Sequence, residues 1–110
     1  MSINEIVDVI CANHDEILSI AVNRSAELVH MGMEYARKVE RKNGDWDIVW
    51  AIPVSDDTEI VIGDRHTEFQ PYVAWHCFRM ESYAWGHYCQ TFGGAFDCAL
   101  EKIRKELHMD

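Results

Sequence analysis

The feature that most constrains the fold is a change of hydrophobic period at residue 45. From there the segment DWDIVWAIPV, residues 45 to 54, has Trp, Ile or Val at every even-numbered position. Successive side chains of a β-strand point to opposite faces, so this alternation predicts a strand with one face in a core. Pro53 cannot donate a ladder hydrogen bond, which places it at the end of the strand or on a sheet edge.

A second strand is expected in the segment EIVIG, residues 59 to 63, after a short polar turn. A register that sets Val54 against Ile60 and Ile52 against Ile62 keeps the apolar residues of both strands on one face. The two segments are therefore expected to form a first hairpin.

Residues 2 to 42 instead show apolar residues at helical spacing, with one glycine and no proline. One straight helix of this length would extend about 60 Å, too long for a compact domain of this size. Ser2 with Glu5, and Asn13 with Glu16, both fit the capping pattern of a helix start. We therefore expect an N-terminal helix that is broken or bent, ending at the Asn-Gly pair after residue 42.

Two more strands are expected at about residues 72 to 79 and 83 to 90, followed by a helix at about 94 to 108. The fold class is therefore α+β, a single domain over residues 1 to 110. It combines the N-terminal helix, a four-stranded antiparallel sheet of two hairpins, and a C-terminal helix packed on one face. No apolar run reaches the roughly 20 residues of a membrane span, and the acidic N-terminus lacks the basic start of a secretion signal. We expect a cytoplasmic protein without a membrane partner.

The second hairpin contains a stretch rich in histidine and cysteine, YVAWHCFRMESYAWGHYC. If its turn is centred on the Glu-Ser pair, His76 faces His87 and Cys89 lies on the same face, with opposed Cβ atoms about 5 Å apart. Imidazole and thiolate are zinc ligands, and Asp64, His66 or water would complete the set. A zinc-binding or enzymatic domain is therefore one alternative, although no spacing motif accompanies these residues.

The charge of the chain is strongly negative and unevenly distributed. The formal net charge is −9, and residues 45 to 68 hold seven acidic residues against one arginine, which is −6 of that total. Direct binding of nucleic acid requires clustered Lys and Arg, and the tight basic group within residues 37 to 42 suits a helix C-terminus. We therefore expect no direct nucleic-acid contact, and an acidic solvent face and tip on the first hairpin.

An acidic face of this kind, bordered by aromatic residues, fits a surface that docks on a basic partner. We hypothesise a non-catalytic protein-interaction module that needs no cofactor and binds a basic, nucleic-acid-binding surface of another protein. The candidate contact residues are Asp45, Asp47, Asp56, Asp57, Glu59, Asp64 and Glu68, with Trp75, Tyr83 and Tyr88 as aromatic anchors. A third hypothesis is a homo-oligomeric structural module, such as a homodimer formed through a sheet edge or the long helix.

In size, acidity and absence of a catalytic motif, the chain resembles the small inhibitors made by phages and mobile elements, such as anti-CRISPR proteins. The resemblance is one of general character and covers no alignable motif. It implies an inhibitor that occupies a nucleic-acid-binding groove, and it assigns no residue.

Overall fold

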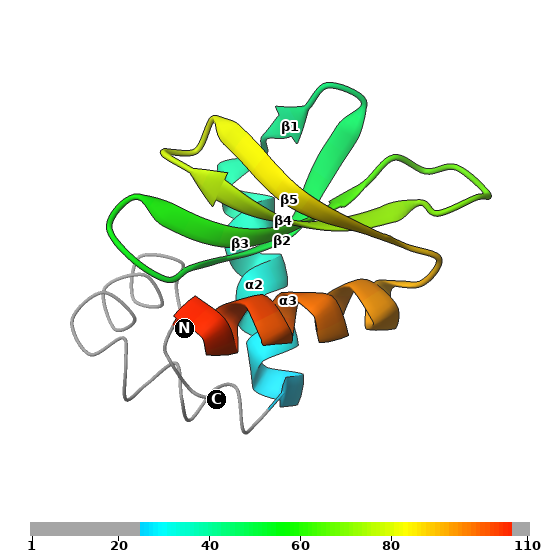
Figure 1. Cartoon of the computed structure of the whole chain (residues 1–110). Helices are drawn as coiled ribbons and strands as arrows, with labels where there is room; N and C mark the ends of the chain where they lie inside the picture. The colour runs from blue at the N-terminus through cyan, green and yellow to red at the C-terminus, as the bar shows by residue number, and fades with distance from the viewer. Residues whose placement is uncertain (1–24, 107–110) are drawn as a thin grey trace.

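The computed structural model describes residues 25 to 106, and the expected break in the N-terminal helix lies outside them. The fold is α+β as expected, with a helix, a curled antiparallel sheet and a C-terminal helix (Figure 1). In chain order the elements are α2 (Ser25–Val39), β1 (Lys42–Asn43), β2 (Trp46–Pro53), β3 (Thr58–Asp64), β4 (Tyr72–Phe78), β5 (Ser82–Cys89) and α3 (Phe92–Glu106).

The sheet is a meander in which each strand pairs with the next one along the chain, in the order β1-β2-β3-β4-β5. The expectation of four strands missed β1, which is only two residues long and pairs with the start of β2. Helix α2 ends at Val39, before the Asn-Gly pair, and Glu40 after it has a φ of 48°. Gly44, with a φ of 59°, lies in the turn between β1 and β2.

The register of the β2–β3 hairpin differs by two residues from the expected one. Ile60 lies opposite Ile52 rather than Val54, and Ile62 lies opposite Trp50. A shift of two residues keeps Trp50, Ile52 and Val54 on their expected face, because the side-chain period of a strand is two. A bulge between Ile48 and Trp50, which the alternation did not predict, places Trp46 and Ile48 on the opposite face instead. Val54 instead begins the turn and is buried there, with its N–H donating to the Thr58 carbonyl at 2.9 Å.

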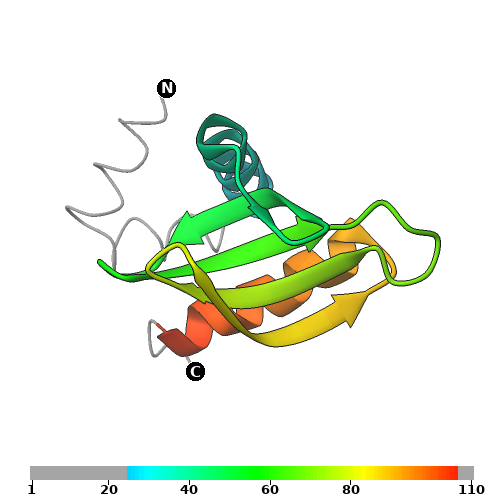
Figure 2. The same ribbon diagram turned by 90° about the horizontal axis from the view of Figure 1, so that it is seen from above.

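Helix α3 covers one face of the sheet, and α2 packs chiefly against β2. Figure 1 shows α3 running below the sheet, and Figure 2 shows α2 standing beside its β2 side. The apolar stripe of α3 meets the buried residues of β2, β3 and β4 in one core cluster, which includes Trp50, Ile52, Ile60, Ile62, Ala74, Phe96, Ala99, Leu100 and Ile103. This is the expected packing of a C-terminal helix on one face.

The opposite face of the sheet forms a second core, which its own curl and Ala36 of α2 enclose. Val61, Val73 and Cys77 are buried there together with Trp75. Trp46 on β2 reaches Tyr88 on β5, with ring centroids 5.9 Å apart, although two strands lie between them in the sheet. The curl therefore lets aromatic side chains from distant strands fill the concave face.

The contact between α2 and the sheet is unusually close at Gly32. The indole Nε1 of Trp50 donates a hydrogen bond to the Leu28 carbonyl at 3.2 Å, and a Cβ at Gly32 would overlap with that indole. Glycine is unfavourable inside a helix by about 1 kcal/mol. Its presence here is explained by the space that the Trp50 ring occupies.

We predict that Gly32→Ala lowers the free energy of unfolding by at least about 1 kcal/mol, because overpacking outweighs the gain in helix propensity. Urea denaturation would measure the change. Gly93→Ala is the matched control, since no atom lies within 4 Å of a Cβ at that helical position, and we expect it to be neutral or stabilising by about 0.4–1 kcal/mol. A Gly32→Ala variant as stable as the wild type would contradict this account of the interface.

Candidate functional site

The acidic residues of the β2–β3 hairpin lie in two groups at its opposite ends. Asp56 and Asp57 lie in the turn between the strands, whereas Asp47 and Asp64 form the last pair at the other end. Five to six residues of strand separate the groups, or roughly 17–20 Å at 3.3 Å per residue. Asp45 belongs with the second group, as do the β3–β4 loop and its exposed Glu68. The structure therefore does not bring the seven candidate carboxylates into one patch.

The second group is partly neutralised within the chain. Asp47 accepts from His66 Nε2 at 2.7 Å and lies 3.3 Å from Lys42 Nζ. Asp64 lies 3.4 Å from the other ring nitrogen of His66. The hydrogen bonds from His66 and Lys42 lower the pKa of Asp47, and the same bond with the nearby Asp64 raises the pKa of His66.

We predict that His66 titrates above its ordinary pKa of about 6.5 and that Asp47→Asn moves it back toward that value. Because its folded-state pKa is raised, the contribution of His66 to stability is present below the unfolded pKa and is lost as pH rises through the folded pKa. NMR titration of the imidazole protons would measure both values. His76, whose pKa is lowered by burial and by Lys102, is the internal comparison. A His66 pKa at or below 6.5 would contradict the ion pair.

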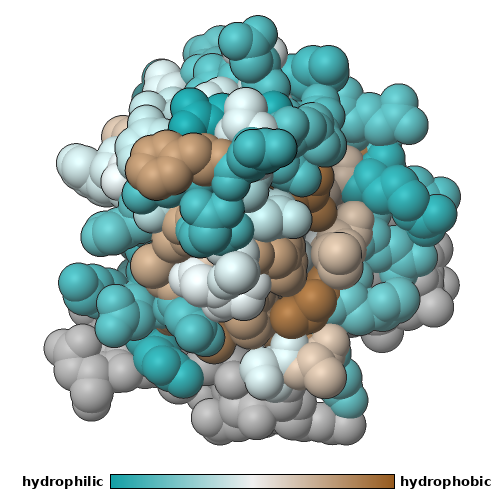
Figure 3. Space-filling view, turned by 90° about the vertical axis from the view of Figure 1, so that its right-hand side faces the viewer, coloured by the Kyte–Doolittle hydropathy of each residue, from teal (hydrophilic) through white to brown (hydrophobic). Residues whose placement is uncertain are grey.

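The aromatic anchor residues differ in how far they reach the surface. Trp75 is only 7 % exposed and belongs to the concave core, so it is not available as an anchor. Tyr83 is half-buried against it, with ring centroids 5.3 Å apart, whereas Tyr88 is 52 % exposed. Two exposed aromatic residues were missed, Trp85 on β5 at 67 % and Phe69 in the β3–β4 loop at 71 %. Figure 3, from the side on which that loop projects, shows apolar atoms gathered among hydrophilic ones.

The expected rung of His76 opposite His87 is wrong, because the turn of this hairpin spans residues 79 to 81 and so lies earlier in the chain than the expected Glu-Ser tip. Arg79 and Met80 form the turn with φ values of 54° and 62°, and a bulge then changes the register near Trp85. As a result His76 lies opposite Ala84, and His87 lies opposite Ala74.

The three candidate metal ligands have other neighbours instead of a shared centre. His76 Nε2 lies 3.2 Å from a Glu106 carboxylate oxygen, and Cys89 Sγ lies 3.9 Å from Cys98 Sγ. Within residues 25 to 106, no group of three His, Cys, Asp or Glu side chains is arranged to hold a metal ion. The geometry therefore gives no support to a zinc site formed by His76, His87 and Cys89.

Glu59 is buried in an ion pair, contrary to its expected position on the solvent face. Its Oε1 accepts a hydrogen bond from Arg41 Nη2 at 2.5 Å, and the exposed fractions of the two side chains are 7 % for Glu59 and 13 % for Arg41. Burial disfavours the charge on Arg41, but the Glu59 carboxylate outweighs this effect and raises the pKa of Arg41. The pair joins the segment after α2 to strand β3.

The ion pair leaves part of its hydrogen-bonding capacity unused. Glu59 Oε2 and Arg41 Nε and Nη1 are buried without a hydrogen-bond partner. An unsatisfied buried polar atom costs about 1–3 kcal/mol, and more when it is charged. Cys77 and Tyr83 lie close by, and burial raises the pKa of Tyr83 to about 12 despite the neighbouring Arg41. This is a confined polar cluster at the margin of the concave core.

We predict that Glu59→Leu alone costs about 3–5 kcal/mol of unfolding free energy, because it leaves the Arg41 charge buried and unpaired. The double variant Arg41→Met with Glu59→Leu is expected to recover most or all of this loss, as replacements of buried ion pairs often do. Arg37→Met is the control, since it breaks the exposed pair with Glu34 and should cost less than about 1 kcal/mol. Urea denaturation measures all three. A double variant as unstable as Glu59→Leu would show that the residual charge is not the cause.

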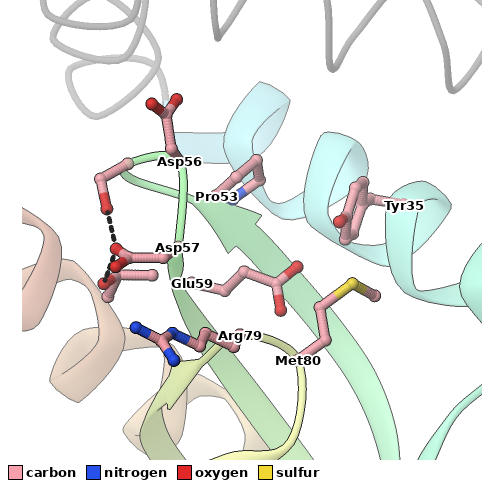
Figure 4. A pocket seen from close by; sticks show the side chains of 9 residues that line it. Tyr35, Pro53, Asp56, Asp57, Glu59, Arg79 and Met80 are labelled. Carbon is pink, nitrogen blue, oxygen red and sulfur yellow. Dashed lines mark hydrogen bonds between the residues drawn. The ribbon is translucent and has the colours of Figure 1, made fainter.

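A hollow of about 200 Å³ opens beside Glu59, between helix α2 and the β2–β3 and β4–β5 turns. Asp57 fixes the first turn, since its Oδ1 accepts from the Ser55 and Thr58 hydroxyls at 3.2 and 3.1 Å. Its carbonyl accepts from the Arg79 N–H at 2.7 Å, which ties the two turns together. Figure 4 shows the residues that line the hollow, with the Glu59 carboxylate turned toward the space between Tyr35 and Met80.

Sequence reasoning identified three acidic residues of this hollow, Asp56, Asp57 and Glu59, but not that they share it with α2. No pattern in the sequence pairs Tyr35 with Met80, because they come from elements 45 residues apart whose contact depends on the curl of the sheet.

In the described part of the chain, no helix is both long and apolar enough to cross a membrane. Comparison of the chain with protein-family models, curated proteins and solved structures gave no significant match.

Proposed function

We propose that the chain is a non-catalytic protein-interaction module that docks the end of its β2–β3 hairpin on a basic surface of another protein. The observation that supports this proposal is that Asp56 and Asp57 are exposed and that, among residues 25 to 106, neither takes part in an ion pair. The acids at the other end of the hairpin are already partly neutralised, so this end offers the stronger attraction to a cationic partner.

The nature of the partner follows from the same charge. A surface that binds nucleic acid is basic, and an acidic protein that covers it competes with the phosphate backbone. We therefore propose an inhibitor that acts in the cytoplasm on a nucleic-acid-binding protein, in the manner of anti-CRISPR and related phage or mobile-element proteins. No direct contact with nucleic acid is part of this proposal.

We predict that Asp56→Lys with Asp57→Lys weakens partner binding by about tenfold to a hundredfold, since like charges placed against a basic surface repel it. The matched control is Asp97→Lys with Glu101→Lys, which reverses two exposed charges on α3 and should leave binding within about twofold. Proteins captured from a lysate of the host would be identified by mass spectrometry at low and high salt. Affinities for the purified partner would then be compared.

Three results together would support the proposal: one partner with a basic surface, capture that weakens at high salt, and displacement of that partner by added nucleic acid. Binding that is insensitive to salt, or equal for the two double variants, would contradict it.

Self-association is a second candidate, because β5 is the outer strand of the sheet and exposes Trp85 and Tyr88. An unprotected edge can pair with another strand. The bulge and the left-handed backbone of Trp85, with a φ of 56°, interrupt the regular edge and disfavour such pairing. Light scattering would show a mass of twice the chain if this edge or the long helix forms a homodimer.

A further inference from the structure

The hollow beside Glu59 has the size of a single side chain. Its volume is about 200 Å³, whereas clefts that bind drug-sized ligands and cofactors measure about 300–1,000 Å³. It is open to solvent between the two turns and the end of α2 (Figure 4). An occupant would therefore be one side chain that projects from a larger molecule.

The floor of the hollow carries an unused hydrogen-bond acceptor. The Glu59 side chain is 93 % buried, and its Oε2 has no partner while Oε1 is held by Arg41. The carboxylate points toward the cavity in Figure 4. This buried oxygen has no partner in the described part of the chain, so a donor that displaces the side chains covering it would satisfy it.

The walls and the mouth differ in character. Tyr35, Pro53 and Met80 give the cavity apolar sides, and Asp56 and Asp57 border it from the β2–β3 turn, with the Asp57 carboxylate held by the Ser55 and Thr58 hydroxyls. Lysine and arginine have this same division, with an apolar stem that packs on hydrophobic surface and a charged head that donates hydrogen bonds.

Arg79 also borders the cavity and is the one cation among its lining residues. Its guanidinium points away from the Glu59 carboxylate in Figure 4. Three carboxylates line the hollow, against Arg79 at its border and Arg41, which is paired with Glu59. The lining therefore keeps a net negative charge, which favours a positively charged head group.

We infer that this hollow binds a lysine or arginine side chain of the partner protein, with the stem against Tyr35 and Met80 and the cationic head toward Glu59. This inference rests on the proposed function and refines it, because it converts general attraction to a basic surface into recognition of one inserted residue. Buried, well-packed anchors of this kind dominate the affinity of many interfaces.

The test is an NMR titration of the ¹⁵N-labelled full chain with three blocked amino acids. The probes are Nα-acetyl-arginine methylamide, its lysine counterpart, and the citrulline counterpart, which has nearly the shape of arginine without its charge. The inference requires saturable chemical-shift changes at the Thr58, Glu59 and Met80 amides with the arginine or lysine probe. The affinity for the citrulline probe should be at least about tenfold lower. The arginine and lysine arms show which head group is preferred.

Glu59→Gln keeps the shape of the side chain and removes its charge, and we expect it to weaken binding of the cationic probe at least fivefold. Because this variant also unpairs Arg41, Asp56→Asn provides a second test at an exposed position, with an expected loss of about twofold to threefold. Asp97→Asn on α3 is the control and should not change the affinity.

Equal shifts with citrulline, or shifts confined to the Asp45 and Asp64 end of the hairpin, would overturn the inference. Loss of partner binding by the Asp56 and Asp57 charge reversal, without any probe binding in the hollow, would leave the proposed function standing and reject only this site. Probe binding in the hollow, with partner capture that is insensitive to salt, would support this site and contradict the proposed function.

Discussion

The buried ion pair between Arg41 and Glu59 is the contact on which the candidate site depends. Arg41 follows α2, and its carbonyl also accepts a hydrogen bond from the Ile48 N–H at 3.1 Å. Glu59 lies near the start of β3, beside the turn that carries Asp56 and Asp57. The pair therefore holds the end of the helix against the acidic end of the hairpin, and the hollow lies where these elements meet.

The curl of the sheet supplies the second constraint. Trp75 lies against Gly63 and Gly86, where any Cβ would come within 3 Å of its ring. Trp46 and Tyr83 pack on the same indole at centroid distances of 5.3 Å. Glycines on both neighbouring strands make room for this ring, and Ala36 and Tyr35 of α2 complete the packing of the concave face. The meander topology places the β2–β3 and β4–β5 turns at the same end of the sheet, where the Arg79 N–H bonds to the Asp57 carbonyl.

The sequence predicted those features that depend on local period and missed those that depend on turns. The alternation in residues 45 to 54 was sufficient to predict the strand β2. It could not show the bulge that places Trp46 and Ile48 on the concave face while Trp50 and Ile52 pack in the core with α3. The tip of the second hairpin could not be placed, since Arg79 and Met80 are not residues that normally adopt a positive φ. In the observed register His87 lies opposite Ala74 rather than His76, so the expected metal site loses its basis. Likewise, a count of charges could not show that Glu59 was inside.

The energetics of Glu59 bear on why such a residue is present. A buried ion pair is weak evidence for stability, because apolar residues of similar volume often serve as well or better. A pair with an unsatisfied oxygen is less favourable still. If the hollow binds a donor as we propose, that donor would relieve the cost only in the complex. Under the binding role that we propose for the hollow, recognition of a cationic side chain would account for the presence of Arg41 and Glu59 in place of two hydrophobic residues.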